Sequence, residues 1–217
     1  SNLIKKPQGD LNIAATHALG IDYLPEAISK FSTLNSKATF ETVTLHYDEI
    51  IKQVLELKVD LGIVYDPVPH SDLINKPIIK GKFVVIAPQS FFPNKSSLNI
   101  DDIKSQPFIK ITDKVGPRGP LGSKLEEYLL TNSINLDPTF NTETYQVALA
   151  LVSKGMGITI TDRISAESSF HPNIKILDLK PDLEFSLEIV YSKSNPLSLI
   201  NKSFISFLND FKYNNDV

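Results

Sequence analysis

The order of hydrophobic patterns in the first third of the chain constrains its fold more than any other feature. Apolar, strand-forming runs alternate with patterns in which apolar residues recur every three or four positions, as on one face of a helix. The runs and the helical patterns follow one another as strand 11–16, helix 22–31, strand 38–45, helix 48–57 and strand 59–65. This order predicts an α/β fold with a parallel sheet and right-handed crossovers.

A second set of the same elements follows a break in the pattern near residues 87–108, so we expect two lobes around a cleft. Three prolines interrupt the rhythm at 66–77, and we expect the polar tail after Phe211 to fray. The further expected strands are 83–88, 139–143, 157–161 and 186–191, and the further expected helices are 123–130, 145–155 and 198–211.

Composition excludes several classes of function for this segment. The net charge is −3 and no basic stripe occurs, so this part of the chain is not expected to hold nucleic acid. The absence of cysteine excludes disulfides, thiolate nucleophiles and cysteine-ligated zinc. No apolar run approaches the length of a membrane-spanning helix. The only methionine is Met156, so we expect a fragment or a processed product with something missing upstream.

Polar residues follow three successive predicted strands, at the point where each strand ends. These pairs are Thr16-His17, His46-Tyr47 and Tyr65-Asp66. Ligands of open parallel sheets bind beyond the carboxyl ends of the strands, where the N-termini of the next helices also point. The sequence therefore predicts a ligand site on the edge that these three pairs share.

Metal binding and catalysis are the less favoured interpretations of these residues. His17, His46 and Asp66 could ligate a metal, but they do not form a compact ligand motif, and two hydrogen-bonding histidines are the simpler reading. No nucleophile motif or phosphate-binding loop occurs, so we expect no enzyme and no cofactor. Arg118 lies in a Gly/Pro-rich loop and could pair with an anionic ligand. Thr142 and Thr144 precede a helix, where capping and ligand binding are both open.

A series of short motifs resembles the effector-binding domain of LysR-type transcriptional regulators, from about Gly9 to Phe211. Each motif is weak by itself, but their order and spacing match the family. The matching segments are "GDLNIAATH", "YLPEAISKF", "LELKVDLGIVYDP", "FVVIAP", "SLNIDDIKSQPFI", "LALVSKGMGITIT" and "LEIVYSKSNPLS".

The resemblance implies two Rossmann-like subdomains, joined by two crossing strands as in type 2 periplasmic binding proteins. Subdomain I would comprise 9–87 with 190–217, and subdomain II would comprise 88–189, with a small effector in the cleft between them. By position, the family's ligand contacts would be Thr16, His17, Ala18, His46, Tyr47, Thr112 and Thr142. The resemblance also implies a cytoplasmic regulator that forms dimers, and tetramers at full length. It would bind DNA through a winged helix-turn-helix that this sequence lacks, and RNA polymerase is a possible partner.

Two departures from the family bear on the ligand. The sulfur-assimilation subgroup has Thr-His-Thr-Gln in the first loop, whereas this chain has Ala18 and Leu19 in the last two positions, which disfavours a sulfate-type oxyanion. His46 and Tyr47 are larger than the usual residues of the second turn. A larger, partly apolar carboxylate is therefore expected. The alternative function is a periplasmic solute-binding protein, which shares the fold but should be monomeric. A third interpretation, a small transferase or lyase of the same architecture, is supported by no sequence motif.

Overall fold

The computed structural model describes residues 9–112, 119–134, 138–168 and 171–213. Contacts divide the chain into two compact units, which are described separately below. The first unit comprises Ser1–Lys80 with Ser186–Asp216, and the second comprises Gly81–Phe185. The strands β4 (Leu73–Pro88) and β10 (Glu184–Ser192) each contain a boundary between the units. The subdomain limits expected from the sequence, 87/88 and 189/190, fall within the same two strands and stay a prediction.

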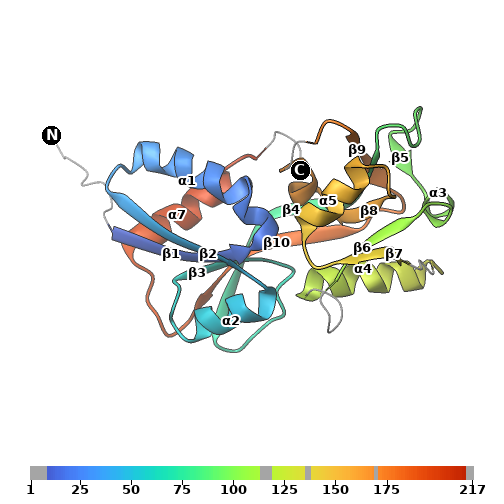
Figure 1. The fold of residues 1–217 in the computed structure, drawn as a ribbon. Helices are drawn as coiled ribbons and strands as arrows, with labels where there is room; N and C mark the ends of the chain where they lie inside the picture. The colour runs from blue at the N-terminus through green and yellow to red at the C-terminus, as the bar shows by residue number, and fades with distance from the viewer. Residues whose placement is uncertain (1–8, 113–118, 135–137, 169–170, 214–217) are drawn as a thin grey trace. The chain divides into compact units, whose positions relative to one another are not determined.

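The first unit is the predicted α/β sheet (Figure 1). Its remaining elements are β1 (Gly9–Thr16), the 3₁₀ helix η1 (His17–Gly20), α1 (Tyr23–Leu34), β2 (Ala38–Leu45), α2 (Tyr47–Leu55), β3 (Leu61–Tyr65) and α7 (Leu199–Asp210). β1 pairs in parallel with both β2 and β3, which confirms the parallel sheet, and β10 pairs antiparallel to β3. Figure 1 shows α1 and α7 on one side of these strands and α2 on the other.

Apolar side chains pack against both faces of the sheet of the first unit. On the α2 side, Ala14, Val64 and Val190 of three neighbouring strands pack with Ile50 and Val54. Gly62 of β3 lies at this contact, and a Cβ there would come within 2.8 Å of the Ile50 and Val190 side chains. The small residue in the "VDLGI" segment therefore lets α2 approach the strand closely.

Rings fill the other face of the sheet. The fully buried ring of Phe204 lies 5.1 Å from that of Phe31 and 5.7 Å from that of Phe40, measured between centroids. Tyr213 is also buried, and its hydroxyl donates a hydrogen bond of 2.6 Å to Asp22. The expectation that the tail frays directly after Phe211 was therefore wrong. Asp22 stands at the N-cap position of α1 but makes no side-chain cap.

The second unit contains a mixed sheet and a separate pair of parallel strands. Its remaining elements are β5 (Ser97–Leu98), α3 (Ile100–Lys104), β6 (Phe108–Ile111), α4 (Gly119–Thr131), β7 (Pro138–Thr142), α5 (Tyr145–Ser153), β8 (Thr159–Asp162), α6 (Arg163–Glu167) and β9 (Ile174–Leu179). β4 pairs antiparallel with β8 and β9, and β5 runs parallel to β9. In Figure 1, α4 and α5 flank the β6–β7 pair. Among the described residues, no helix is long and apolar enough to cross a membrane.

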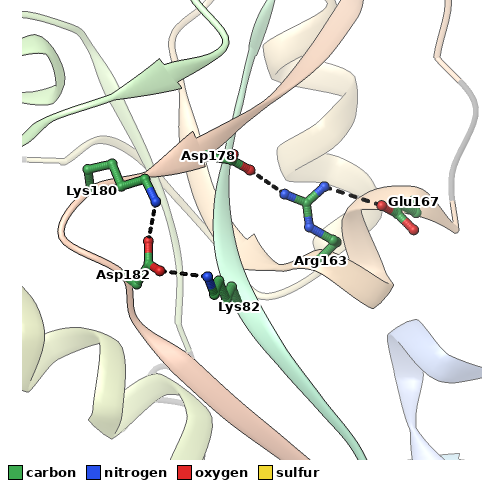
Figure 2. A network of polar contacts seen from close by, with 6 residues as sticks. All are labelled: Lys82, Arg163, Glu167, Asp178, Lys180 and Asp182. Atoms are coloured by element: carbon green, nitrogen blue, oxygen red, sulfur yellow. Dashed lines mark hydrogen bonds and ion pairs between the residues drawn. The ribbon is translucent and has the colours of Figure 1, made fainter. Parts of the chain in front are cut away.

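Polar side chains bind one another inside the second unit. The Tyr145 hydroxyl donates a buried hydrogen bond of 2.6 Å to the Ser165 carbonyl, and the Thr159 hydroxyl donates one of 2.8 Å to the Ile109 carbonyl. Figure 2 shows two ion-pair clusters on the surface of this unit. Asp182 lies 2.6 Å from the ammonium groups of both Lys82 and Lys180, and Arg163 pairs with Glu167 and Asp178.

Candidate functional site

The carboxyl ends of β1, β2 and β3 meet at one edge of the first unit, as the sequence predicts. Thr16, the last residue of β1, is level with Leu45, the last residue of β2. Beyond β1 the chain enters η1, where Ala18 is half-buried. Gly20 permits this tight path, because a Cβ there would meet the Thr44 methyl group at 2.5 Å. We call this edge the first-unit edge.

Two histidines are in contact on the first-unit edge. The ring centroids of His17 and His46 lie 5.0 Å apart, and the rings are inclined by 72° in an edge-to-face arrangement. His46 is also the N-cap residue of α2, and its backbone N–H donates to the Glu49 carboxylate at 3.4 Å. The imidazoles are therefore brought together by two strand ends that are 29 residues apart in the chain and adjacent in the sheet.

Tyr47 lies across the loop that follows β3. Its hydroxyl accepts a hydrogen bond of 2.9 Å from the backbone N–H of Val68. Burial of the phenol raises the pKa of Tyr47, the Val68 hydrogen bond opposes this shift, and the nearby Asp48 carboxylate adds to it. The hydroxyl is thus neutral at physiological pH, and the residue packs against the apolar cluster that contains Ile50 and Val54.

Asp66 directly follows β3 and is hydrogen-bonded to the neighbouring strand β10. Its φ of 42° is in the left-handed region, which is uncommon for a residue other than glycine. Its N–H donates to the Ser186 carbonyl at 2.8 Å, and its Oδ1 accepts from the Ser186 N–H at 3.1 Å. The Asp66 side chain therefore binds the backbone of Ser186, which is the first residue of β10 that belongs to the first unit. Sequence reasoning missed Ser186, because nothing local indicates which strand pairs with β3.

Two hydroxyl groups on the first-unit edge have unused hydrogen-bonding capacity. The Oγ1 atom of Thr16 and the Oγ atom of Ser186 are buried and have no hydrogen-bond partner in the part of the chain that the structure describes. A buried hydroxyl without a partner costs free energy, so such groups in a native fold call for an explanation. Both belong to the same edge as the histidine pair.

The second candidate region is the end of the β6–β7 pair, which we call the second-unit edge. Thr112 follows β6, and its N–H donates a hydrogen bond of 2.9 Å to the carbonyl of Thr142, the last residue of β7. The Thr142 hydroxyl accepts from the Thr144 N–H at 3.3 Å. Thr144 caps α5 by accepting from the Val147 N–H at 3.4 Å. Capping is therefore the role that the structure gives Thr144, whereas Arg118 lies outside the described residues.

Metal binding finds little support in this geometry. Within the described ranges of the chain, no three or more histidine, aspartate or glutamate side chains are grouped so that they could hold a metal ion. The contacting histidines instead place two imidazole rings next to the N-terminus of α2, an arrangement suited to binding a small anionic or polar molecule.

A family model for the LysR substrate binding domain matches residues 5–212. The chain belongs to this family. This LysR domain is 31% identical over 210 residues to the HTH-type transcriptional regulator DgcR of Pseudoalteromonas, covering 96% of this chain and 71% of that protein. Family members are transcriptional regulators and not enzymes, and they support the regulator interpretation over the solute-binding protein.

Solved structures agree with the fold of this LysR domain. HinK, a LysR family regulator from Pseudomonas aeruginosa, matches with a TM-score of 0.84 at 15% identity, covering 96% of this chain and 72% of that chain. The CcmR regulatory domain from Synechocystis, solved in complex with 2-PG, matches with a TM-score of 0.82 at 17% identity, covering 97% of this chain and 100% of that chain. The fold is therefore the two-lobe, periplasmic-binding-protein-like fold of LysR effector-binding domains.

Proposed function

We propose that this LysR domain senses a small anionic metabolite, which binds at the first-unit edge. The observation that carries the proposal is the contact between His17 and His46 at the ends of two adjacent parallel strands. An imidazole can donate a hydrogen bond to an anion and gains a positive charge when protonated. The 2-PG complex of the structurally similar CcmR domain supports a small-molecule effector.

The proposed contacts are divided between the two edges. On the first-unit edge they are Thr16, His17, Ala18, His46, Tyr47 and Asp66. On the second-unit edge they are Thr112 and Thr142, and Arg118, which lies outside the described residues, is a further proposed contact. Because the Thr142 hydroxyl already bonds within its own turn, we assign the larger share of effector affinity to the first-unit edge.

The proposed partners follow from the regulator family. In a longer protein, a DNA-binding segment would precede this domain. The reason is that DgcR is an HTH-type regulator, and this chain matches 71% of its length. We propose a cytoplasmic homodimer, or a tetramer of the longer protein, that acts on transcription through DNA and RNA polymerase. Effector binding would shift the population of domain arrangements, by an amount set by the difference in affinity for each arrangement.

A calorimetric comparison of histidine variants tests the proposed site. A panel of small mono- and dicarboxylates is first ranked by the rise in melting temperature, and the best compound is then titrated by calorimetry. We expect His17→Ala to weaken binding about tenfold, equivalent to about 1.4 kcal/mol, and to leave the melting temperature of the free domain unchanged. His70→Ala is the matched control, because His70 lies in the exposed loop after β3. Unchanged affinity in His17→Ala would remove the site from this edge.

A further inference from the structure

Ser186 lies on the same face of the sheet as Thr16. Ala15 of β1 is level with Ile63 of β3, so Thr16 is level with Val64, which in turn pairs with Glu188 of β10. Paired residues of adjacent strands point to the same side of a sheet, as do residues two apart in one strand. Thr16, Glu188 and Ser186 therefore share the face that carries Val64, which is the face covered by α2.

The two unsatisfied hydroxyls are too far apart to bind one small oxyanion together. Thr16 and Ser186 lie on strands that are separated by one strand, β3, and they are offset by two residues along the strand direction. Their Cα atoms are therefore about 10–12 Å apart. A hydrogen bond spans about 2.8 Å between oxygen atoms. A ligand that bonds both hydroxyls therefore needs polar groups at both ends, at least about 4–6 Å apart.

The charges beside the two hydroxyls have opposite character. Next to Thr16 are His17 and its ring partner His46, which offer donors and favour an anionic group. Ser186 is bonded to Asp66 and lies two residues from the half-buried Glu188. Two carboxylates disfavour an anionic group at the Ser186 end and favour a hydrogen-bond donor or a cation there.

We propose that Ser186 is a further effector contact, and that the effector is an elongated acid with its carboxylate at Thr16 and His17 and an ammonium or hydroxyl group at Ser186. This inference rests on the proposed effector site of the first-unit edge and narrows its ligand class. It explains why two buried hydroxyls lack partners in the described part of the chain, since each is reserved for one end of the ligand. Ser186 then sets specificity at the end of the site remote from the histidines.

Three acids that differ only at the remote end test the ligand class. δ-Aminovalerate carries an ammonium group, glutarate a second carboxylate and valerate a methyl group. Calorimetry is expected to show δ-aminovalerate binding at least tenfold more tightly than glutarate or valerate. Ser186→Ala should weaken δ-aminovalerate about tenfold and leave valerate unchanged. The matched control is Ser192→Ala on the same strand, whose hydroxyl already bonds Ser194 at 2.8 Å, and it should change none of the affinities.

A measurement without ligand tests the same assignment independently. Ser192→Ala is expected to lower the melting temperature of the free domain by about 2–4 °C, since it loses an internal hydrogen bond. Ser186→Ala should leave it unchanged or raise it. An equal loss in both variants would give the Ser186 hydroxyl an internal role and overturn the proposal.

The remaining outcomes separate this inference from the proposed function. Equal binding of the three acids, tightest binding of glutarate, or no binding of any of them at about 10 mM would overturn the ligand class. The effector site itself would still be decided by the broader carboxylate panel and by His17→Ala. A loss of valerate affinity in Ser186→Ala would place this residue at the wrong end of the ligand and would also count against the proposal.

Discussion

Three neighbouring buried polar side chains of the second unit differ in their hydrogen bonding from two hydroxyls of the first unit. In the second unit the buried side chains of Thr159, Thr161 and Asp162 all bond within the protein, to the Ile109 carbonyl, to Asp162 and to the Ser165 N–H respectively. In the first unit rings and aliphatic side chains make the core, while the hydroxyls of Thr16 and Ser186 have no partner in the described chain.

The presence or absence of an internal hydrogen-bond partner distinguishes polar groups that stabilise the fold from polar groups that can bind a ligand. A hydroxyl with an internal partner stabilises the fold, and its removal leaves the partner unsatisfied. A hydroxyl without a partner costs free energy until a ligand supplies one. Polar character alone therefore does not mark a binding residue. Thr142 and Thr16 both end strands, but of these two only Thr16 has a hydroxyl without a hydrogen-bond partner in the described part of the chain.

The largest expected effect comes from the aromatic core of the first unit. Phe204→Ala should lower the free energy of unfolding by about 3–5 kcal/mol, because Phe204 is fully buried among other rings and its truncation leaves a cavity. Urea denaturation measures the change, and added salt should not alter it. Leu199→Ala on the same helix is the control, since Leu199 is 75% exposed and should have little effect. A loss below 1 kcal/mol would show that this unit does not depend on its rings.

The next effect tests the internal polar contacts of the second unit. Tyr145→Phe removes only the hydroxyl that donates to the Ser165 carbonyl, which then keeps one hydrogen bond, from the Ser168 hydroxyl. We expect the free energy of unfolding to fall by about 1 kcal/mol in urea denaturation. Tyr191→Phe provides a matched control on β10. An unaltered free energy of unfolding in Tyr145→Phe would remove the contrast between the units.

A pair of threonine variants should shift stability in opposite directions. Thr144→Ala removes the cap of α5 and is expected to cost about 1 kcal/mol, which Thr144→Ser should restore because serine also caps. Thr16→Val keeps the side-chain shape and removes an unsatisfied hydroxyl, so it should be neutral or stabilising in the free domain. Thermal melting of the three variants checks both expectations. Destabilisation by Thr16→Val equal to that by Thr144→Ala would refute the distinction between the edges.

Sequence patterns were sufficient where the signal is local. The alternation of strand and helix periodicities correctly predicted β1 through β3 with the helices between them, and it placed Thr16, His17 and His46 at strand ends. The parallel order then brought the histidines together, because adjacent parallel strands end at the same edge.

Features that depend on distant residues could not be predicted in this way. The prolines of 66–77 interrupt the pattern, yet β4 already begins at Leu73 and contains Pro77, because pairing within the folded chain extends the strand. The polar tail contains the buried Tyr213, whose hydroxyl partner Asp22 lies 191 residues away. Ser186 was missed for the same reason, since its place beside Asp66 follows from antiparallel pairing that has no local signature.

The smallest expected effect tests the surface charges of the second unit. The hydrogen bond from Lys180, and then that from Lys82, lowers the pKa of Asp182 from its ordinary value of 3.8 to about 2. A lowered pKa means that the folded state favours the ionised carboxylate. The stabilisation is therefore complete above about pH 4 and is lost as the pH falls towards 2.

Asp182→Asn should flatten the fall in melting temperature over this interval, whereas Asp101→Asn, at an exposed position of α3, should leave it unchanged. Because these groups are exposed, we expect a shift of only about 1 °C that 1 M salt abolishes. A salt-independent shift as large as that of Tyr145→Phe would mean that surface ion pairs, and not buried hydrogen bonds, hold the second unit together.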